Sequence, residues 1–414
     1  MMDIEALNLV EELLRSLNIG QPLSDIQSVV FLGTWEGCSY REIADEFGYE
    51  LDYIKQVGSR LWRSLSQAAG EEVSKRNIQA VLRRYQQSSP MQDWGEAIAI
   101  SHFYGRVGEL ETLETWVASD RTRLIGIFGL GGIGKTTLSV KFAQQVQSQF
   151  KSVIWRSLQQ APPLNLLLGE ILPILTGSTD TGDASISALL TQLRQKPCLL
   201  VFDNVESILQ AGNRSGQYQP GYEDYRQLFE RIGDESHQSC LMITGREKPG
   251  GFAVREGKNL PVRSLSLFGL SAVEAQQLLI AKGLEASYTQ SQLLVKYFGG
   301  NPLALKIAAT AIQTLFGGNI RSFLAQGNTV FSDLWDLLDR QFERLSPLQQ
   351  QIMYWLAING EAVTPVKLQA KIIPKVSWRE LLEALESLEA RSLTEDERSR
   401  FETTETGLTQ QPVI

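Results

Sequence analysis

Histidine and cysteine are scarce in this chain of 414 residues. It has only two histidines, His102 and His237, and three cysteines, Cys38, Cys198 and Cys240. Zinc sites need several such ligands at short spacing, and nucleophilic catalysis by histidine needs an orienting partner for that base. The sequence therefore disfavours both chemistries. The cysteine usage does not predict a disulfide framework and suits a reducing compartment.

Long apolar runs and internal repeats are also missing. No run reaches the 18 or more apolar residues of a membrane-spanning helix, and the start, MMDIEALNLVEELLR, has acids where a signal peptide has bases. We therefore expect a cytoplasmic protein that does not associate with membranes. Hydrophobic residues make up 43% and the formal net charge is −8, which fits globular domains. The length predicts two to four of them.

Hydrophobic periodicity divides the chain into five parts. Residues 1–88 have helical patterns, and 89–101 are typical of a linker. Between 102 and 268, short apolar runs alternate with helical stretches, which predicts a parallel sheet with helices on both faces. A helical lid domain is expected at 269–342 and a winged-helix domain at 343–414, giving a multidomain α and α/β protein. The five expected strands are Leu124–Phe128, Val153–Trp155, Leu199–Phe202, Leu241–Ile243 and Val262–Leu267.

Residues 129–137, GLGGIGKTT, satisfy the pattern G-x-x-x-x-G-K-[ST] of a phosphate-binding loop. The loop follows an apolar run and begins an amphipathic helix, as nucleotide binding requires. Backbone N–H groups of such a loop surround phosphate oxygens, and Lys135 is expected to reach the β- and γ-phosphates. Thr136 is expected to bind Mg²⁺ through its hydroxyl. The expected nucleotide-binding residues here are Gly129, Gly131, Gly132, Ile133, Gly134, Lys135, Thr136 and Thr137.

A second Mg²⁺ ligand is expected at Asp203, which follows the apolar run 199–202. A strand that ends in Asp brings its carboxylate to the C-terminal edge of the sheet, where ligands of open α/β sheets bind. Glu206, three residues further on, could orient or deprotonate the attacking water. A solvated acid in the first turn of a helix is an equally good interpretation of Glu206.

Arg246 follows the next apolar run, within Thr244-Gly245-Arg246. A guanidinium at this strand end could sense a γ-phosphate, because its fork matches phosphate oxygens. A surface ion pair is the alternative. The expected catalytic residues are therefore Lys135, Asp203, Glu206 and Arg246.

Together these motifs resemble the NB-ARC branch of the STAND signalling ATPases, over about residues 102–400. Residues 103–109, FYGRVGE, resemble the hhGRExE box of that family, which implies that Arg106 lies in an adenine-binding segment. Residues 299–305, GGNPLAL, resemble its G-x-P motif, which implies that Pro302 packs near the nucleotide. The resemblance implies ATP or ADP with Mg²⁺ as ligands.

Some departures from the family pattern carry their own expectations. Asn204 stands where the family often has a second acid, which argues against fast hydrolysis and makes Glu206 the candidate replacement. The C-terminal part resembles the family's winged helix, but it has no histidine for the family's contact with ADP. The chain is similar to bacterial, especially cyanobacterial, members that continue into WD-type repeats. No such repeat follows here, so we expect a truncated version or a member with a partner in trans.

Residues 23–65 carry a helix-turn-helix pattern, with Gly48 at the turn. It resembles sigma-factor region four, LuxR-type domains and the N-terminal domain of proteins associated with von Willebrand A and MoxR proteins. Residues 1–90 contain nine Lys and Arg against thirteen Asp and Glu, the wrong balance for a strong duplex binder. We therefore favour a protein partner over DNA.

Two functional hypotheses remain from the sequence. The first is a nucleotide-driven switch with slow ATP hydrolysis, in which the ATP state self-associates and the N-terminal domain engages an effector protein. The second is a transcription regulator whose helix-turn-helix binds DNA under control of the same ATPase. A metabolic kinase or transferase is disfavoured, because no site for a second substrate is recognisable.

Overall fold

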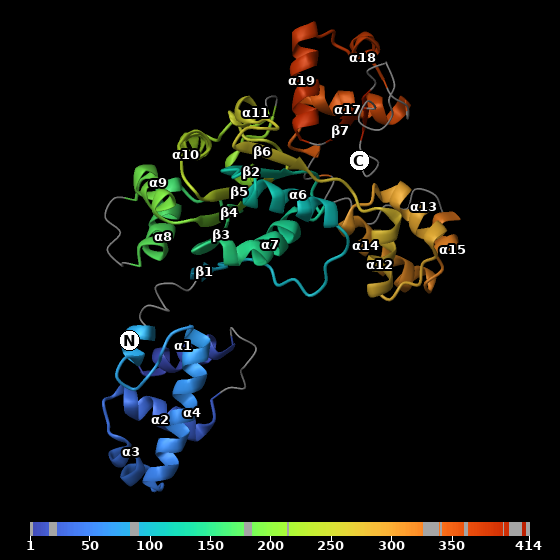
Figure 1. Cartoon of the computed structure of the whole chain (residues 1–414). Coiled ribbons are helices and arrows are strands. Elements are labelled where there is room, and N and C mark those ends of the chain that lie inside the picture. The colour runs from blue at the N-terminus through green and yellow to red at the C-terminus, as the bar shows by residue number, and fades with distance from the viewer. Residues whose placement is uncertain are drawn as a thin grey trace. The chain divides into compact units, whose positions relative to one another are not determined.

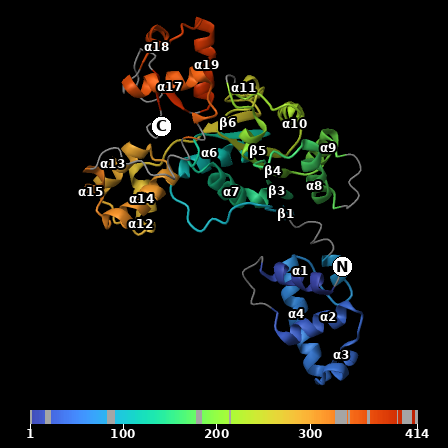
Figure 2. The same cartoon turned by 180° about the vertical axis from the view of Figure 1, so that it is seen from behind.

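The computed structural model describes residues 3–15, 23–82, 91–177, 184–212, 215–325, 339, 342–359, 363–391, 393–396 and 408–410. The chain forms two compact units, residues 1–89 and 90–414. Figures 1 and 2 show their elements from opposite sides. Within the described ranges, no helix has the length and apolar character needed to cross a membrane.

The described part of the N-terminal unit is helical, and the predicted helix-turn-helix is confirmed. Its helices are α1 (Asp3–Arg15), α2 (Asp25–Trp35), α3 (Tyr40–Phe47) and α4 (Leu51–Ala69). A capping box begins α3, because the Ser39 hydroxyl accepts the Glu42 N–H while the Glu42 carboxylate accepts the Ser39 N–H. Gly48 ends α3 with φ of 71°, a left-handed conformation that glycine adopts without strain.

Helices α3 and α4 approach each other closely. The indole N–H of Trp62 donates a hydrogen bond of 2.6 Å to the Tyr40 hydroxyl. Gly58 makes this approach feasible, because a Cβ there would lie 2.5 Å from the Tyr40 hydroxyl oxygen. Ile43 of α3 and Leu61 of α4 are fully buried in the same hydrophobic core of the unit. The turn angle is therefore fixed by side-chain packing as well as by Gly48.

The second unit is built on a six-stranded parallel sheet with the order β1-β3-β4-β5-β2-β6. Each of the five expected strands is present, with ends within two residues of those expected. The expected total of five is wrong, because a sixth strand pairs at the edge. The strands are β1 (Met91–Asp93), β2 (Leu124–Phe128), β3 (Ser152–Ser157), β4 (Cys198–Asp203), β5 (Cys240–Gly245) and β6 (Val262–Ser266).

The strand missed by the sequence analysis, β1, lies in the segment that was expected to be a linker. It has three residues, Met-Gln-Asp, and pairs with β3 at the edge of the sheet. Met91 and Gln92 are exposed, as befits an edge strand. So short a run without β-branched residues gives no hydrophobic alternation, which is the signal on which strand prediction depends.

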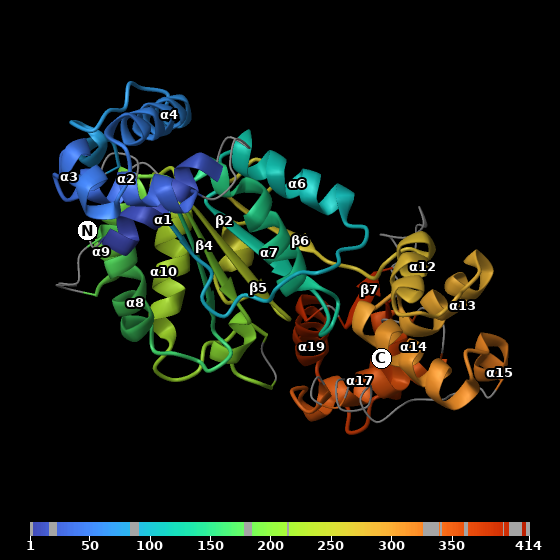
Figure 3. The ribbon, with the colours of Figure 1, turned by 90° about the horizontal axis from the view of Figure 1, so that it is seen from below.

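Alternate residues of the strands bury side chains in two separate cores. Ile125, Ile127 and Val201 face the core that contains α7, whereas Leu200 and Phe202 face the core that contains α8, α9 and α10. Figure 3 shows α6 and α7 together on one side of the strands. The predicted two-sided cover is thus confirmed. These elements are α6 (Val107–Ala118), α7 (Lys135–Val146), η1 (Gln147–Gln149), α8 (Leu164–Thr176), α9 (Ile186–Gln195), η2 (Val205–Ile208), α10 (Glu223–Asp234) and α11 (Phe252–Arg255).

The chain continues after β6 into two helical groups. The lid group contains α12 (Ala272–Ala281), α13 (Tyr288–Phe298), α14 (Pro302–Phe316) and α15 (Ile320–Ala325). The C-terminal block, residues 343–414, contains α17 (Pro347–Asn359), α18 (Pro365–Lys371), α19 (Trp378–Ala390) and the antiparallel strands β7 (Thr394–Asp396) and β8 (Leu408–Gln410). Three helices with a two-stranded wing form the winged helix expected from the sequence. Both groups share one continuous apolar core with α7.

Candidate functional site

The loop between β2 and α7 has the backbone that its glycines suggest. Gly132 and Gly134 have φ of 75° and 102°, values that side chains other than glycine rarely tolerate. Gly132 also lacks room for a side chain, because a Cβ there would lie 2.7 Å from the Leu303 Cβ. Gly134 immediately precedes α7, so the free N–H groups of this helix face the loop.

Lys135 is the charged side chain inside the loop. Its ammonium donates hydrogen bonds of 2.9 Å to the carbonyl oxygens of Gly129 and Leu130, and only 8% of the residue is exposed. Burial lowers the pKa of Lys135 to about 8. Among the described residues, no carboxylate forms an ion pair with this ammonium. Lys135 is thus a buried cation whose direct partners are neutral.

Asp203 lies opposite the loop at the C-terminal end of β4 and is 2% exposed. The Thr136 hydroxyl donates to both of its carboxylate oxygens, at 3.0 and 2.9 Å. The Thr244 hydroxyl and the Asn204 amide, at 3.0 Å, also donate to this carboxylate. Burial raises the pKa of Asp203, although the hydrogen bonds from Thr244 and Thr136 act in the opposite direction. The structure therefore brings together the two residues expected to bind Mg²⁺.

Glu206 and Arg246 form an ion pair at the ends of neighbouring strands. Arg246 Nε lies 3.1 Å from Glu206 Oε1, and the Arg246 backbone N–H donates to Glu206 Oε2 at 3.3 Å. Glu206 is buried, with 9% of the residue exposed, so it is not a solvated acid in this structure. The sequence analysis considered both residues separately and did not predict this pairing.

Arg106 joins three segments that are far apart in the sequence. Its guanidinium donates to the carbonyl oxygens of Ile133, at 3.1 Å, and Phe268, at 2.6 Å, and pairs with Glu109 at 2.8 Å. The Arg106 backbone N–H donates to Glu274 of α12 at 3.1 Å. Arg106 is 6% exposed and has φ of 64°. It therefore fixes the loop, the end of β6 and the first lid helix to one another.

The lid group contacts the phosphate-binding loop through the start of α14. The Asn301 side-chain amide donates to the Gly131 carbonyl at 2.8 Å, and the Leu303 N–H donates to the Gly132 carbonyl at 3.3 Å. Asn301 is also the N-cap of α14, because its side-chain oxygen accepts the N–H groups of Leu303 and Ala304. The sequence analysis quoted this motif for Pro302, the first residue of α14, and did not assign a role to Asn301.

A cavity of about 290 Å³ lies between the loop, the 101–106 segment and the lid helices. Its walls combine apolar and aromatic residues with two lysines, a composition typical of small-molecule sites. The rings of His102 and Tyr104 are nearly parallel, with centroids 6.3 Å apart. The lining residues are Ser101, His102, Phe103, Tyr104, Arg106, Ile133, Gly134, Thr137, Leu270, Leu278, Ala281, Lys282, Pro302 and Lys306.

The donor set at Asp203 fits Mg²⁺ shared with a nucleotide. In the part of the chain that the structure describes, no group of three or more His, Cys, Asp or Glu side chains could hold a metal ion alone. One hydroxyl and one carboxylate are present instead, at Thr136 and Asp203. Mg²⁺ is commonly bound by one or two carboxylates together with substrate phosphates. The residues therefore fit a metal ion that arrives with a phosphate ligand.

Several residues of this site were missed by the sequence analysis. Thr244 was named only as part of the segment that contains Arg246, although its hydroxyl binds Asp203. Glu274 and Lys306 lie on lid helices and Lys282 directly follows α12; Glu274 closes the capping box of Ser271, a local signal for the start of a helix but not for a contact with Arg106. Their positions follow from the way α12 and α14 pack on the loop, which is not encoded by any local pattern.

The sheet, the loop and the paired Thr136 and Asp203 define a P-loop NTPase fold. Residues 107–211 match the NB-ARC domain, and residues 1–85 match the vWA-MoxR associated protein N-terminal HTH. The chain thus carries a region similar to the NB-ARC domain together with an N-terminal helix-turn-helix region of the von Willebrand A/MoxR-associated type. The predicted resemblance is confirmed in both parts.

The chain is also similar to individual proteins in sequence or in fold. The chain is 48% identical over 344 residues to an uncharacterized WD repeat-containing protein of Nostoc sp., which covers 79% of this chain and 27% of that protein. It is 27% identical over 225 residues to disease resistance protein RRS1 of Arabidopsis thaliana, covering 50% of this chain and 16% of that one. The chain thus spans much less than two thirds of these relatives. A Walker-type ATPase of Pyrococcus abyssi has a similar fold, with a TM-score of 0.50, 14% identity, and coverage of 75% of this chain and 94% of that chain.

Proposed function

We propose that this protein is a molecular switch that binds ADP and ATP with Mg²⁺ and hydrolyses ATP slowly. The observation that supports it most is the joint attachment of the lid to the phosphate-binding loop. Asn301 and Leu303 bind the carbonyls of Gly131 and Gly132, so the loop and α14 share hydrogen bonds. A ligand seated on this loop therefore acts directly on the position of the lid.

The residues that would hold the nucleotide are those of the loop and of the cavity beside it. The N–H groups at the start of α7 and the Lys135 ammonium would bind phosphate oxygens. Thr136 and Asp203 would hold Mg²⁺, which neutralises phosphate charge when bound. Arg106 would orient the walls of the cavity for the base, since it binds both Ile133 and Phe268. Thr137 and Pro302 line the same cavity.

The pairing of Glu206 and Arg246 supports slow hydrolysis. The Glu206 carboxylate accepts the Arg246 backbone N–H through Oε2 and forms an ion pair with Arg246 Nε through Oε1, and this positive partner makes the carboxylate a weaker base toward water. Arg246 in turn would have to leave Glu206 in order to bind a γ-phosphate. The pairing thus holds Arg246 away from a γ-phosphate and Glu206 away from an attacking water. Hydrolysis would require both side chains to move.

Signalling through the N-terminal unit is the output that we favour. The start of α4 carries two acids, Glu50 and Asp52, and the Asp52 side chain is 90% exposed. Asp52 pairs with Lys55 at 3.0 Å, which leaves little net positive charge at the start of α4 for a phosphate backbone. We propose an effector protein as the partner of this unit and self-association of the ATP-bound form as the trigger.

The direct test identifies nucleotide released from the purified protein on denaturation and measures binding of labelled ADP and ATP. Lys135→Ala should lose both, because the loop's buried cation is removed. Lys141→Ala, on the same helix but outside the site, should retain both. A Lys135→Ala variant that binds nucleotide as well as Lys141→Ala would refute the proposal.

The alternative, an ATP-gated transcription regulator, is favoured by the helix-turn-helix alone. Its test is the triple substitution of Lys55, Arg60 and Arg63 by alanine on α4, with DNA retention measured against salt concentration. We expect wild type and variant to be retained equally weakly. A salt-sensitive complex that the variant loses would establish DNA as the partner.

A further inference from the structure

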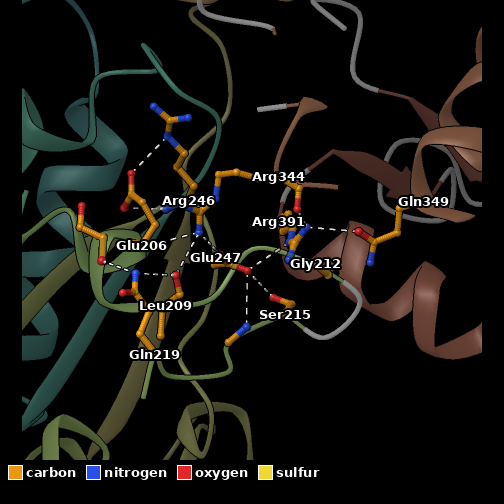
Figure 4. Close-up of polar contacts among 12 residues, drawn as sticks. Glu206, Leu209, Gly212, Ser215, Gln219, Arg246, Glu247, Arg344, Gln349 and Arg391 are labelled. Carbon is orange, nitrogen blue, oxygen red and sulfur yellow. Dashed lines mark hydrogen bonds and ion pairs between the residues drawn. The ribbon is translucent and has the colours of Figure 1, made fainter. Parts of the chain in front are cut away.

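Glu247, the residue after Arg246, is a carboxylate buried to 1% exposure and surrounded by donors. Arg344 donates to its Oε1 at 3.0 Å, and Arg391 donates to its Oε2 at 3.1 Å. The Ser215 hydroxyl and the Gly216 N–H also donate to Oε2, at 3.0 and 3.4 Å. One anion of the nucleotide-binding domain is thus bound by two cations (Figure 4).

Both cations belong to the C-terminal block, and the Arg391 guanidinium makes further hydrogen bonds besides that to Glu247. Its guanidinium donates to the Arg344 carbonyl at 2.9 Å, to Gln349 at 3.2 Å and to the Gly212 carbonyl at 2.9 Å. The Gly212 N–H donates to the Arg344 carbonyl at 3.0 Å. The contact therefore joins the C-terminal block to the segment that follows β4 by backbone as well as side-chain bonds.

The same cluster touches the phosphate-sensing pair. Arg344 donates to the backbone carbonyl of Glu206 at 3.2 Å, while the Glu206 side chain holds Arg246. Glu247 is joined to Arg246 by a peptide bond. Figure 4 shows Arg344 positioned with Glu206 on one side and Glu247 on the other. The Arg246 backbone N–H also binds Glu206 Oε2, so a backbone movement that separates Arg246 from Glu206 would displace acceptors that Arg344 and Arg391 use.

We propose that Glu247, Arg344 and Arg391 form a latch that reports the phosphate state of the site to the C-terminal block. The latch is closed when Arg246 is paired with Glu206, as in this structure. It opens when Arg246 turns to a terminal phosphate, because the Glu206 carbonyl and the Glu247 carboxylate then shift away from the two guanidiniums. The coupling to nucleotide rests on the proposed function, whereas the closing role of Glu247 does not.

The closing role is tested by hydrogen exchange at the Gly212 amide in the full chain without added nucleotide. Glu247→Gln keeps the size of the side chain and removes the charge that binds the two cations. We expect at least tenfold faster exchange at Gly212 and in α19. Lys248→Gln is the matched control. Lys248 is the next residue after Glu247, and its substitution breaks a 2.7 Å ion pair with Glu256 that is not part of the latch. Unchanged exchange in Glu247→Gln, or equal acceleration in both variants, would overturn the latch.

The coupling is tested by the ratio of ATP to ADP affinity. Allosteric coupling is reciprocal, so a latch that ATP opens must, when broken by substitution, favour ATP over ADP. We expect Glu247→Gln to raise this ratio roughly tenfold, within the usual 5- to 150-fold range of such couplings, and Lys248→Gln to leave it unchanged. A purely structural role of Glu247 would lower stability without moving the ratio, and that result would overturn the coupling. If wild type binds neither nucleotide, the proposed function and the coupling both fail, and the exchange result at Gly212 decides the latch alone.

Discussion

The carboxylates of Asp203 and Glu247 are both almost fully buried, and they lie at the ends of neighbouring strands, β4 and β5, yet their surroundings differ in kind. Asp203 is bound by neutral donors, the hydroxyls of Thr136 and Thr244 and the Asn204 amide. Glu247 is bound by two guanidinium groups. A buried charge without a counter-charge is costly, whereas a paired one is tolerated.

This difference indicates what each carboxylate is for. Burial raises the pKa of Asp203, which means that the hydrogen bonds from Thr244 and Thr136 do not fully offset the cost of burying its charge; a bound cation would offset more of that cost. The charge of Glu247 is already balanced by Arg344 and Arg391, so it does not need a metal ion. Glu247 instead holds the C-terminal block against the nucleotide-binding domain. The neutral donors around Asp203 thus indicate a ligand site, whereas the two guanidinium groups around Glu247 indicate a structural contact between two parts of the chain.

The largest effect on stability is expected from Glu247→Ala. The buried guanidinium of Arg391 and the half-buried one of Arg344 would be left without their carboxylate, and breaking a buried pair in this way costs about 3–5 kcal/mol. Urea unfolding of the purified chain measures the loss. Lys248→Ala, which breaks a more exposed ion pair, should cost about 1 kcal/mol or less. Equal losses of unfolding free energy in the two variants would mean that the ion pairs of Glu247 with Arg344 and Arg391 stabilise the chain no more than an exposed ion pair does.

Asp203→Asn should separate binding from stability. The amide keeps the size of the side chain and removes the uncompensated charge, so we expect stability to change by about 1 kcal/mol or less. The contribution of Mg²⁺ to the binding of an ATP analogue should fall by about 100-fold, the upper end of the effect of residues that only orient a metal ligand. Isothermal titration with and without Mg²⁺ measures it. A strongly destabilised variant would show that Asp203 is structural, like Glu247.

The two cations of the latch should differ in importance. Side-chain exposure is 6% for Arg391 and 29% for Arg344. Water can therefore replace the lost contact less well after removal of Arg391 than after removal of Arg344. We expect Arg391→Gln to cost about 2 kcal/mol and Arg344→Gln about 1 kcal/mol in urea unfolding, since Glu247 keeps one cation in each case. The reverse order would show that exposure does not govern the strength of these pairs.

The smallest effect is expected from Thr244→Val, which keeps the shape of the side chain and removes one hydroxyl from Asp203. Residues that orient a metal ligand typically contribute 10- to 100-fold to metal affinity, and the low end of that range, about tenfold, is expected here because Thr136 remains. The same titration with an ATP analogue measures this. Ser187→Ala on α9, away from the site, serves as the unaffected control.

The sequence predicted those parts of the molecule that depend on local patterns. The phosphate-binding loop, the strand that ends in Asp203 and the turn at Gly48 each have a signal within about ten residues. The latch has none, because Glu247 lies 97 residues from Arg344 and 144 residues from Arg391. The pairing of Glu206 with Arg246 likewise needs the neighbouring positions of β4 and β5, and a parallel sheet does not reveal its strand order in the sequence. The edge strand β1 was missed because three residues are too few to show alternation.

The measurement that tests this account most directly is the Mg²⁺ dependence of ATP-analogue affinity, determined together with Gly212 exchange in wild type, Asp203→Asn and Glu247→Gln. The account predicts that Asp203→Asn loses the Mg²⁺ contribution and keeps slow exchange. Glu247→Gln should keep the Mg²⁺ contribution and exchange faster. If Asp203→Asn retains the full Mg²⁺ contribution, or Glu247→Gln abolishes it, the two carboxylates do not have the separate roles that their surroundings indicate.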